Sequence, residues 1–525
     1  GGVDLAGLTR AVIANFVSGR RGQGGSTITM QIARTFYLPS EKLYTRKIYE
    51  IALALKIEAE LSKDRILEVY INQIFLGQRA YGFGAAAQTY FGKRLTDLSV
   101  GEMAVLAGLP VAPSAFNPRV NPKRAKARQQ YVLGRMLQLG YIDRSTHDAA
   151  VAAPIDTPRP TTTAAGGAPN AARPRVHAEF AAEVARQLMF DVFREETYTR
   201  GLNVHTTIVS AEQQSAWEAL RNQVLDYDRR YGYRGPEAFI DLGTDPVLRE
   251  QRIEDALIEA IDSPNLIPAV VLESSPKSVR VALQGGGEAE ITGNGLRFAA
   301  RSLDPKAQPT RRIVPGAVVR LKAVAGKTPA FEIVQLPQVE AAFVAANTSD
   351  GAVRALVGGF DFNLNKFNHV TQAWRQPGSS FKPFVYSAAL EKGFMPSTLI
   401  NDAPLLVDPN MTGGQVWEPK NYDGRFEGPL RMRQGLAKSK NLVSIRLLQA
   451  ISPQFAQQHL QRFGFAPERH PAYLTLALGA GSVTPWQMLS GYAVFASGGY
   501  RVNPYLVSRV TDASGKLDRL HTNFL

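Results

Sequence analysis

The sequence pattern changes three times along the chain, and these changes constrain the fold more than any other feature. From Leu5 to about Arg144, apolar residues recur every three or four positions, which is the period of an amphipathic helix. Between about 228 and 338, short alternating runs separated by glycine turns predict strands. At 525 residues the chain is also too long for one hydrophobic core. We therefore expect several domains of different fold classes.

The pattern predicts four segments. The stretch 152–175 is rich in proline, threonine and glycine, so it cannot build a core and is predicted to be a linker or loop. Short, evenly spaced strands favour a small barrel. The predicted segments are an all-α domain at 1–150, the linker and first elements of the last region at 151–227, a small β-barrel at 228–338, and an α/β region at 339–525.

Five elements of the later segments can be placed more closely. After the linker we expect a helix, a strand and a second helix, and the last segment should open with two paired strands. The predicted ranges are 177–193, 202–208, 211–226, 341–347 and 352–357.

Charge is unevenly distributed. The net charge is +14, and residues 1–150 carry 20 Lys and Arg against 11 Asp and Glu. Such a surplus indicates an anionic ligand or surface, such as pyrophosphate or phospholipid, or simply a solvated basic face. Nucleic acid is disfavoured, because the basic run 123–128 has no interleaved aromatic residues.

Other composition features exclude further classes. The chain has no cysteine, so disulfides and cysteine-ligated metals are excluded. No run of 18 apolar residues is present, so no spanning helix is predicted. The chain opens at Gly1 without a methionine, and we expect a fragment whose targeting or anchor segment lies outside it.

A serine motif lies at 378–382, where Ser379 and Lys382 have the Ser-x-x-Lys spacing. In a helix this spacing places both side chains on one face. A lysine whose pKa is lowered by burial could then take the serine proton and create a nucleophile. Gly378 permits a sharp entry that exposes the hydroxyl at a helix N-terminus.

Alone this motif is weak, because it recurs at 274–277, where Pro276 argues against a helix. A Ser-x-Asn motif at 439–441 is equally weak alone, and 263–265 matches it by chance. Together, both at predicted helix starts and 60 residues apart, they resemble the penicillin-recognising serine transpeptidases.

This resemblance implies roles for four residues. Ser379 is the acylated nucleophile, Lys382 its base, Ser439 a proton relay and Asn441 the group that holds the substrate amide. The family's third motif, Lys-Thr-Gly, does not occur after residue 441. We expect the chain to end before that strand.

A second set of motifs lies in the basic first segment. The runs 24–50, 63–72 and 102–113 resemble, in order, motifs of the lysozyme-like peptidoglycan glycosyltransferases. In this chemistry a pyrophosphate departs, so cations must stabilise it and a carboxylate must accept a proton.

The resemblance implies that Glu50 is the second catalytic carboxylate and that the principal one lies upstream of residue 1. The other interpretation of Glu50 is an exposed helix residue paired with Arg46. A divalent metal is expected to assist this site, and no protein-bound metal is assigned. The implied donor-binding residues are Ser26, Thr27, Gln31, Arg34, Lys42, Arg46 and Lys47.

Both halves together resemble the class A penicillin-binding proteins, in particular the 1A type of Gram-negative bacteria. The resemblance implies a lysozyme-like helical domain, an OB-like domain and an α/β transpeptidase domain. It implies polymerisation of lipid II into nascent peptidoglycan, cross-linking of stem peptides ending in D-Ala-D-Ala, and acylation of Ser379 by penicillins. It also implies a location at the periplasmic face of the inner membrane, contact with the membrane surface, and a regulatory protein at the OB-like domain.

Two other functions remain open from the residues alone. A D,D-carboxypeptidase or β-lactamase would release its acyl group to water, but neither needs a pyrophosphate site. A non-catalytic scaffold would bind partners through the β-rich segment. Labelled penicillin separates the three functions, since a synthase keeps the label, a lactamase turns it over, and a scaffold does not react.

Overall fold

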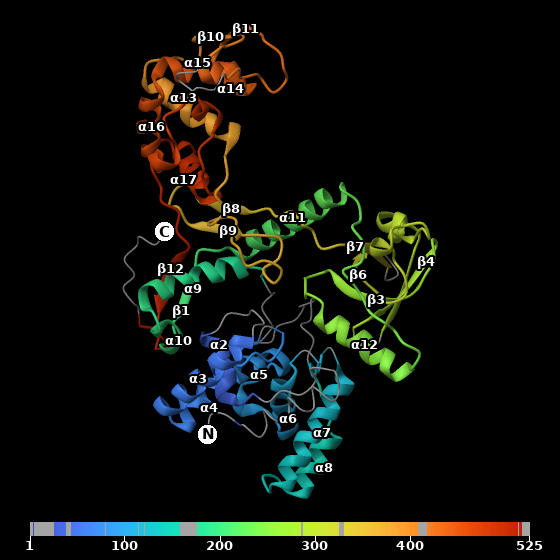
Figure 1. Cartoon of the computed structure of the whole chain (residues 1–525). Coiled ribbons are helices and arrows are strands. Elements are labelled where there is room, and N and C mark those ends of the chain that lie inside the picture. Colours follow the sequence, from blue (N-terminus) through green and yellow to red (C-terminus); the bar gives the residue numbers. More distant parts are fainter. Residues whose placement is uncertain are drawn as a thin grey trace, which may run out of the picture. The chain divides into compact units, whose positions relative to one another are not determined.

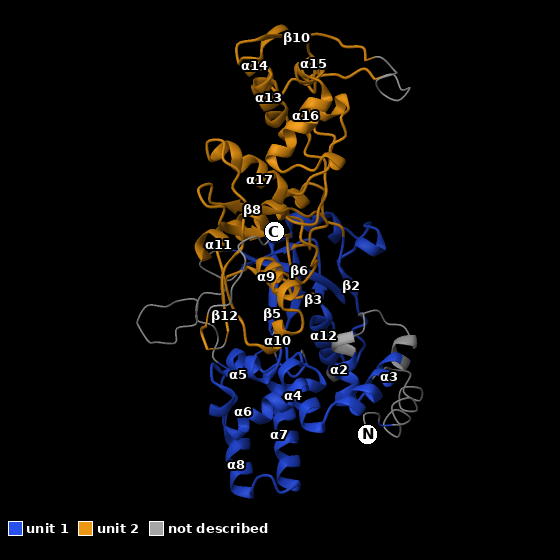
Figure 2. Cartoon of the chain, turned by 90° about the vertical axis from the view of Figure 1, so that its left-hand side faces the viewer, with its two compact units in different colours: residues 1–172, 235–260, 267–333 blue, residues 173–234, 261–266, 334–525 orange. Residues whose placement is uncertain are grey.

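The computed structural model describes most of the chain and divides it into two compact units (Figures 1 and 2). Unit 1 comprises residues 1–172, 235–260 and 267–333, and unit 2 comprises residues 173–234, 261–266 and 334–525. The described residues are 4, 26–37, 44–78, 80–113, 115–119, 121–157, 176–284, 287–324, 330–407, 417–512 and 514–516.

The first part of unit 1 is helical, as predicted. Its helices are α2 (Ile28–Tyr37), α3 (Tyr44–Glu60), α4 (Lys63–Gln73), α5 (Phe83–Phe91), α6 (Val100–Gly108), α7 (Pro122–Gln138) and α8 (Arg144–Ala152), with 3₁₀ turns η1 (Leu95–Asp97) and η2 (Leu109–Val111). The start of the predicted helical pattern, residues 5–25, lies outside the described residues.

Two helix starts in this part follow directly from capping residues. Ser62 accepts a hydrogen bond from the backbone N–H of Arg65 at the start of α4. Ser99 and Glu102 form a reciprocal capping box at the start of α6. The helix α4 ends at Gln73, because the backbone at Ile74 is already extended.

The β-rich part of unit 1 is a six-stranded antiparallel sheet, with the order β2-β6-β3-β4-β5 and β7 paired to β6. Its core includes Val270 and Val318, which pack with Leu257. The strands are β2 (Ala238–Phe239), β3 (Ile267–Ser274), β4 (Ser278–Leu283), β5 (Glu288–Thr292), β6 (Ala317–Val324) and β7 (Ala330–Val334).

Two expectations for this part need correction. The described strands do not close into a barrel, because β5 pairs only with β4 and then leads into the 3₁₀ run η3 (Gly293–Leu303). The strand-rich segment also contains a 14-residue helix, α12 (Pro246–Glu259). Ile253 and Leu257 pack against the sheet at helical spacing, a signal that was present in the sequence.

In unit 2, a hairpin of β8 (Phe343–Ala346) and β9 (Val353–Val357) is covered on both faces. Leu356 packs with α9 (Glu179–Phe193), whereas Ala355 and Val357 pack with α11 (Ser210–Arg229). Because both faces are buried, β9 is a continuous apolar run instead of an alternating one. The predicted helices and hairpin strands are therefore confirmed, within a few residues at their ends.

The rest of unit 2 is a helical cluster around α13 (Lys382–Glu391) and α15 (Asn441–Ile451) (Figure 1). The remaining elements of unit 2 are α10 (Glu196–Thr199), β1 (Asn203–Thr206), η5 (Gly378–Phe381), β10 (Leu399–Asp402), β11 (Gly428–Arg431), α14 (Met432–Ala437), α16 (Pro453–Leu460), η7 (Gln461–Phe463), η8 (Pro467–Arg469), η9 (Leu474–Leu478), α17 (Pro485–Ala496) and β12 (Val507–Thr511), and the 3₁₀ turn η4 (Pro309–Arg311) belongs to unit 1. Within the described ranges, every helix is too short or too polar to traverse a lipid bilayer.

Candidate active site

Ser379 lies exposed in the short helix η5, directly before α13. The turn begins at Gly378, whose φ of 58° is a conformation that glycine adopts at little cost. Two residues after the serine, the Phe381 ring is fully buried and packs against Phe384 and Phe465, with centroid distances of 5.3 and 5.0 Å. These ring contacts hold the turn in place, and the Ser379 hydroxyl on it remains accessible.

A second glycine supports the same turn from the opposite side. The backbone N–H of Gly378 donates to the carbonyl of Gly479 at 3.3 Å. A Cβ on Gly479 would lie 2.2 Å from the carbonyl oxygen of Gly378, so no side chain fits there. The hydroxyl of Tyr492 also donates to the carbonyl of Ser380 at 2.6 Å. These contacts define the backbone on which Ser379 sits.

Lys382 is buried at the start of α13, with 1% of its surface exposed. Its ammonium donates three hydrogen bonds, to the Ser439 carbonyl at 2.7 Å, to Ser439 Oγ at 3.1 Å and to Asn441 Oδ1 at 2.8 Å. An ammonium has three donors, so these partners use all of them. The predicted residues Lys382, Ser439 and Asn441 therefore converge on one nitrogen atom.

The environment of Lys382 favours its neutral form. Burial lowers the pKa of the Lys382 ammonium to about 8, since its three acceptors carry no formal charge and compensate desolvation only in part. A lysine with this pKa is partly deprotonated near neutral pH, which is what a general base requires.

Ser439 occupies a strained turn before α15. Its φ is 53°, a left-handed conformation that costs energy for a residue other than glycine. Asn441, the first residue of α15, is held on both sides, because its N–H donates to Asn421 Oδ1 and its side-chain amide donates to the Lys420 carbonyl, each at 2.9 Å. Its Oδ1 is thereby oriented towards Lys382.

Lys440 lies between the two motif residues and is also buried, but its ammonium contacts other groups than that of Lys382. Its ammonium lies 3.4 Å from Asp402, 2.9 Å from Asp423 and 3.1 Å from Glu427. Burial lowers the pKa of Lys440, but hydrogen bonds to Asp423 and Glu427 and the charge of Asp402 outweigh this, so the pKa is raised above its ordinary value. Lys440 therefore stays protonated, and its ion pairs hold the turn in place.

Asp402 and Asn421 are site residues that the sequence analysis missed. Asp402 is fully buried and accepts hydrogen bonds from Asn421 Nδ2 at 2.7 Å and from the Glu427 N–H at 3.1 Å. Asn421 in turn accepts from the Asn441 N–H. No spacing rule links residues 402, 421 and 441, so only the fold connects them.

The predicted glycosyltransferase residues are only partly described. Ser26 and Thr27 precede α2, and Thr27 Oγ1 accepts from the Met30 N–H at 3.2 Å. Gln31 lies on α2 and receives a weak 3.4 Å hydrogen bond from the Tyr70 hydroxyl.

Glu50 lies on α3, which packs against α2, and only 2% of its surface is exposed. The interpretation of Glu50 as an exposed residue is therefore wrong, because its side chain faces the helical core. Lys42 and the side chains of Arg34, Arg46 and Lys47 lie outside the described residues.

Metal-ligating side chains do not cluster in the described part of the chain. No group of three or more His, Asp or Glu side chains there could hold a metal ion.

Three family patterns match the chain in order. Residues 1–137 match the transglycosylase family, residues 233–339 match the penicillin-binding protein OB-like domain, and residues 341–524 match the penicillin binding protein transpeptidase domain.

Curated relatives match along 98% of the chain. Penicillin-binding protein 1A of Neisseria flavescens is 47% identical over 516 residues, and that of Pseudomonas aeruginosa is 41% identical over 523 residues. The chain spans 63% and 61% of the length of these relatives. The crystal structure of penicillin-binding protein 1A from Haemophilus influenzae is 36% identical, with a TM-score of 0.67, and the match covers 94% of this chain and 66% of that one.

Proposed function

Since the chain belongs to the class A penicillin-binding proteins of the 1A type, we propose that it serves two steps of peptidoglycan synthesis. The first is glycosyl transfer from lipid II to a growing glycan strand. The second is cross-linking of stem peptides by serine acyl transfer, the step that penicillins block. The observation that carries the proposal is the convergence of Ser439 and Asn441 on the buried, low-pKa amine of Lys382, one helical turn from Ser379.

The acyl-transfer step begins when Lys382 loses a proton. A neutral amine keeps two donors and gains one lone pair, so one of its three acceptors must be released or must become a donor. The contact with Ser439 Oγ, the longest of the three at 3.1 Å, can be released, which leaves the lone pair of Nζ free. The free lone pair then accepts the Ser379 proton as Oγ attacks the carbonyl of the penultimate D-Ala.

The proton then leaves with the departing amine. Lys382 returns it through Ser439 to the nitrogen of the terminal D-Ala, and the C–N bond breaks to leave an ester on Ser379. The amine of a second stem peptide attacks this ester, loses its proton to the same relay, and regenerates the Ser379 hydroxyl. Atoms and charge balance without a cofactor. Asn441 would orient the substrate amide beside the relay.

For the glycosyl-transfer step we propose Glu50 as the second carboxylate of the site on α2 and α3. Ser26, Thr27 and Gln31 would bind donor, together with Arg34, Lys42, Arg46 and Lys47. A divalent metal that assists this step would take most of its ligands from the substrate pyrophosphate and water, because the described residues offer no cluster of ligands.

We further propose that the protein works at the periplasmic face of the inner membrane, where lipid II is available. A regulatory protein would bind the OB-like domain, and the free edge of β5 offers one surface where a strand could add.

Labelled penicillin tests the acyl-transfer proposal on the complete gene product. We expect one lasting adduct per chain, on Ser379, and none in Ser379→Ala. The matched control is Ser380→Ala, since Ser380 Oγ only donates to the Pro377 carbonyl. Rapid loss of the label would favour the hydrolase, and absence of any adduct in the unaltered protein would contradict the proposal.

Lipid II polymerisation tests the glycosyl-transfer proposal separately. Glu50→Gln should lower the rate by 10²-fold or more, as expected for loss of an acid or base, while penicillin attachment at Ser379 is retained. Unchanged polymerisation in this variant would remove Glu50 from the mechanism.

A further inference from the structure

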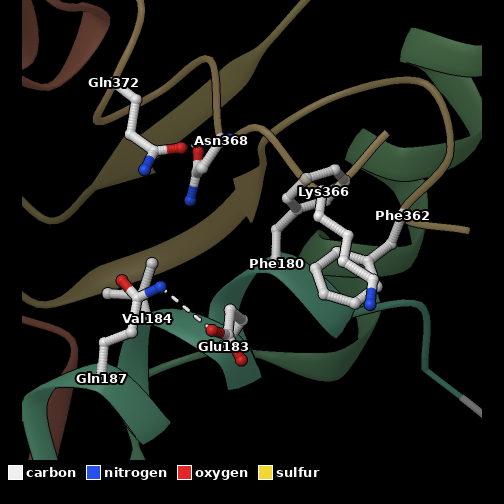
Figure 3. Close-up of a pocket in the computed structure, with 8 residues that line it drawn as sticks. All are labelled: Phe180, Glu183, Val184, Gln187, Phe362, Lys366, Asn368 and Gln372. Atoms are coloured by element: carbon white, nitrogen blue, oxygen red, sulfur yellow. Dashed lines mark hydrogen bonds between the residues drawn. The ribbon is translucent and has the colours of Figure 1, made fainter. Parts of the chain in front are cut away.

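A pocket of about 250 Å³ lies within unit 2, between α9 and the segment that follows β9 (Figure 3). Its lining combines the rings of Phe180 and Phe362 with the polar groups of Glu183, Lys366 and Asn368. No residue of the acyl-transfer site takes part. The volume is slightly below the range typical of drug-sized ligands, so a ligand would have the size of about one amino-acid residue.

The most informative group in the pocket is the side-chain amide of Asn368. The residue is 7% exposed, and its Nδ2 is buried without a hydrogen-bond partner. Its orientation is determined, because Oδ1 accepts from the Val370 N–H at 3.0 Å. Figure 3 shows the amide nitrogen directed into the pocket. A buried unpaired N–H costs free energy, so the site favours a ligand with a carbonyl oxygen.

Lys366 supplies a positive charge at the other side of the pocket. In Figure 3, Asn368 and Lys366 lie on opposite sides of the Phe180 side chain. The Lys366 ammonium lies 6.0 Å from the centre of the Phe362 ring, and among the described residues it forms no ion pair within 4.0 Å. It is therefore available to an anionic ligand.

The one carboxylate of the pocket is already neutralised. Glu183 accepts hydrogen bonds from Arg186 at 2.7 and 2.8 Å and from Gln187 at 3.0 Å. Hydrogen bonding to Arg186 holds the pKa of Glu183 below its ordinary value, and the nearby charge of Lys366 acts in the same direction, so Glu183 stays ionised. With Lys366 added, the pocket has a net positive charge.

We propose that this pocket binds the C-terminal residue of a peptide. The amide carbonyl of the preceding residue would accept from Asn368 Nδ2, the C-terminal carboxylate would lie at Lys366, and the side chain of the C-terminal residue would contact the rings of Phe180 and Phe362. The unpartnered amide N–H calls for a neutral acceptor and the lysine for an anion, and the C-terminus of a peptide provides both on one ligand.

A four-way titration tests the proposal, with acetyl-Gly-Leu and its C-terminal amide as probes on the unaltered protein and on Lys366→Gln. Loss of the carboxylate and loss of the lysine charge should each weaken binding about tenfold. When both are lost together, the affinity should fall no further than with either loss alone. Asn368→Asp keeps the acceptor for Val370 but removes the donor, and should weaken both probes at least tenfold.

Three controls test whether the probes bind in this pocket. Lys392→Gln removes an exposed lysine that likewise lies over a ring, that of Phe455 at 4.1 Å, and should leave binding unchanged. Protein pretreated with penicillin should bind the probes equally, since Ser379 takes no part. Free leucine should bind more weakly, because it lacks the amide carbonyl.

Three results would overturn the proposal. The first is equal binding of acid and amide probes. The second is an affinity unaffected by Lys366→Gln and Asn368→Asp in variants that melt like the parent. The third is no binding at millimolar probe, in which case Asn368 Nδ2 is satisfied by water alone.

Discussion

Two buried lysines contact or belong to the Ser439 turn, and the groups around them differ in charge. Lys382 faces two oxygens of Ser439 and one of Asn441, none of them ionised, and burial lowers its pKa to about 8. Lys440 faces three carboxylates, and its pKa is raised. The difference shows how one residue type can supply a candidate base and a structural cation at the same turn.

The largest effect should come from removing the base. Lys382→Gln keeps a polar side chain but has no titratable nitrogen, so penicillin acylation should fall about 10³-fold. Stopped-flow measurement with a labelled penicillin checks this. Lys438→Gln is the control, because Lys438 is an exposed lysine beside the same turn. If both variants acylate alike, Lys382 is not the base.

Replacing Lys440, the structural cation, should mainly lower the stability of the fold. Lys440→Gln leaves the fully buried Asp402 carboxylate without its counter-ion, which should destabilise unit 2 by about 2–4 kcal/mol. Thermal unfolding followed by near-ultraviolet circular dichroism measures this. A variant that melts normally yet fails to acylate would show that Lys440 acts in the chemistry and not in the fold.

The pH profile should distinguish the two lysines. Because the neutral amine is the active form, acylation should rise about tenfold per pH unit below 8 and level off above it. Lys440 stays protonated through this range, so Lys440→Arg should keep the profile while Lys382→Arg loses it. A profile that is flat between pH 6 and 9 in the parent protein would contradict a low pKa for Lys382.

The smallest expected effect is a difference between two carboxylates that pair with Lys440. Asp402 is fully buried, whereas the Asp423 side chain is 49% exposed and screened by water. Asp402→Asn should therefore lower the melting temperature clearly, and Asp423→Asn should barely change it. Equal shifts from the two substitutions would mean that burial does not decide the strength of these pairs.

The sequence grouped Lys382 with Ser439 and Asn441 because two motifs place these residues at predicted helix starts, and the structure brings the three side chains together. It could not predict the network behind them, since Asp402 and Asn421 reach the turn only through the packing of β10 and α15. The helix α12 was missed because the glycine turns and alternating runs on either side suggested strands throughout, although Ile253 and Leu257 carried the helical period.

The glycosyltransferase region was predicted less completely. Motif order singled out Glu50 as a candidate carboxylate, but periodicity on α3 did not reveal that its side chain is buried. The sequence also did not predict that the described strands of the OB-like domain form an open sheet. Closure depends on which strand edges pair over long range, and local sequence pattern does not specify this.

The contact between Gly378 and Gly479 has a consequence for adaptation. Since a single methyl group at residue 479 would collide with the carbonyl that precedes the nucleophile, every coding change there is expected to be deleterious. A bacterial population under antibiotic selection would have to acquire its substitutions elsewhere around the serine.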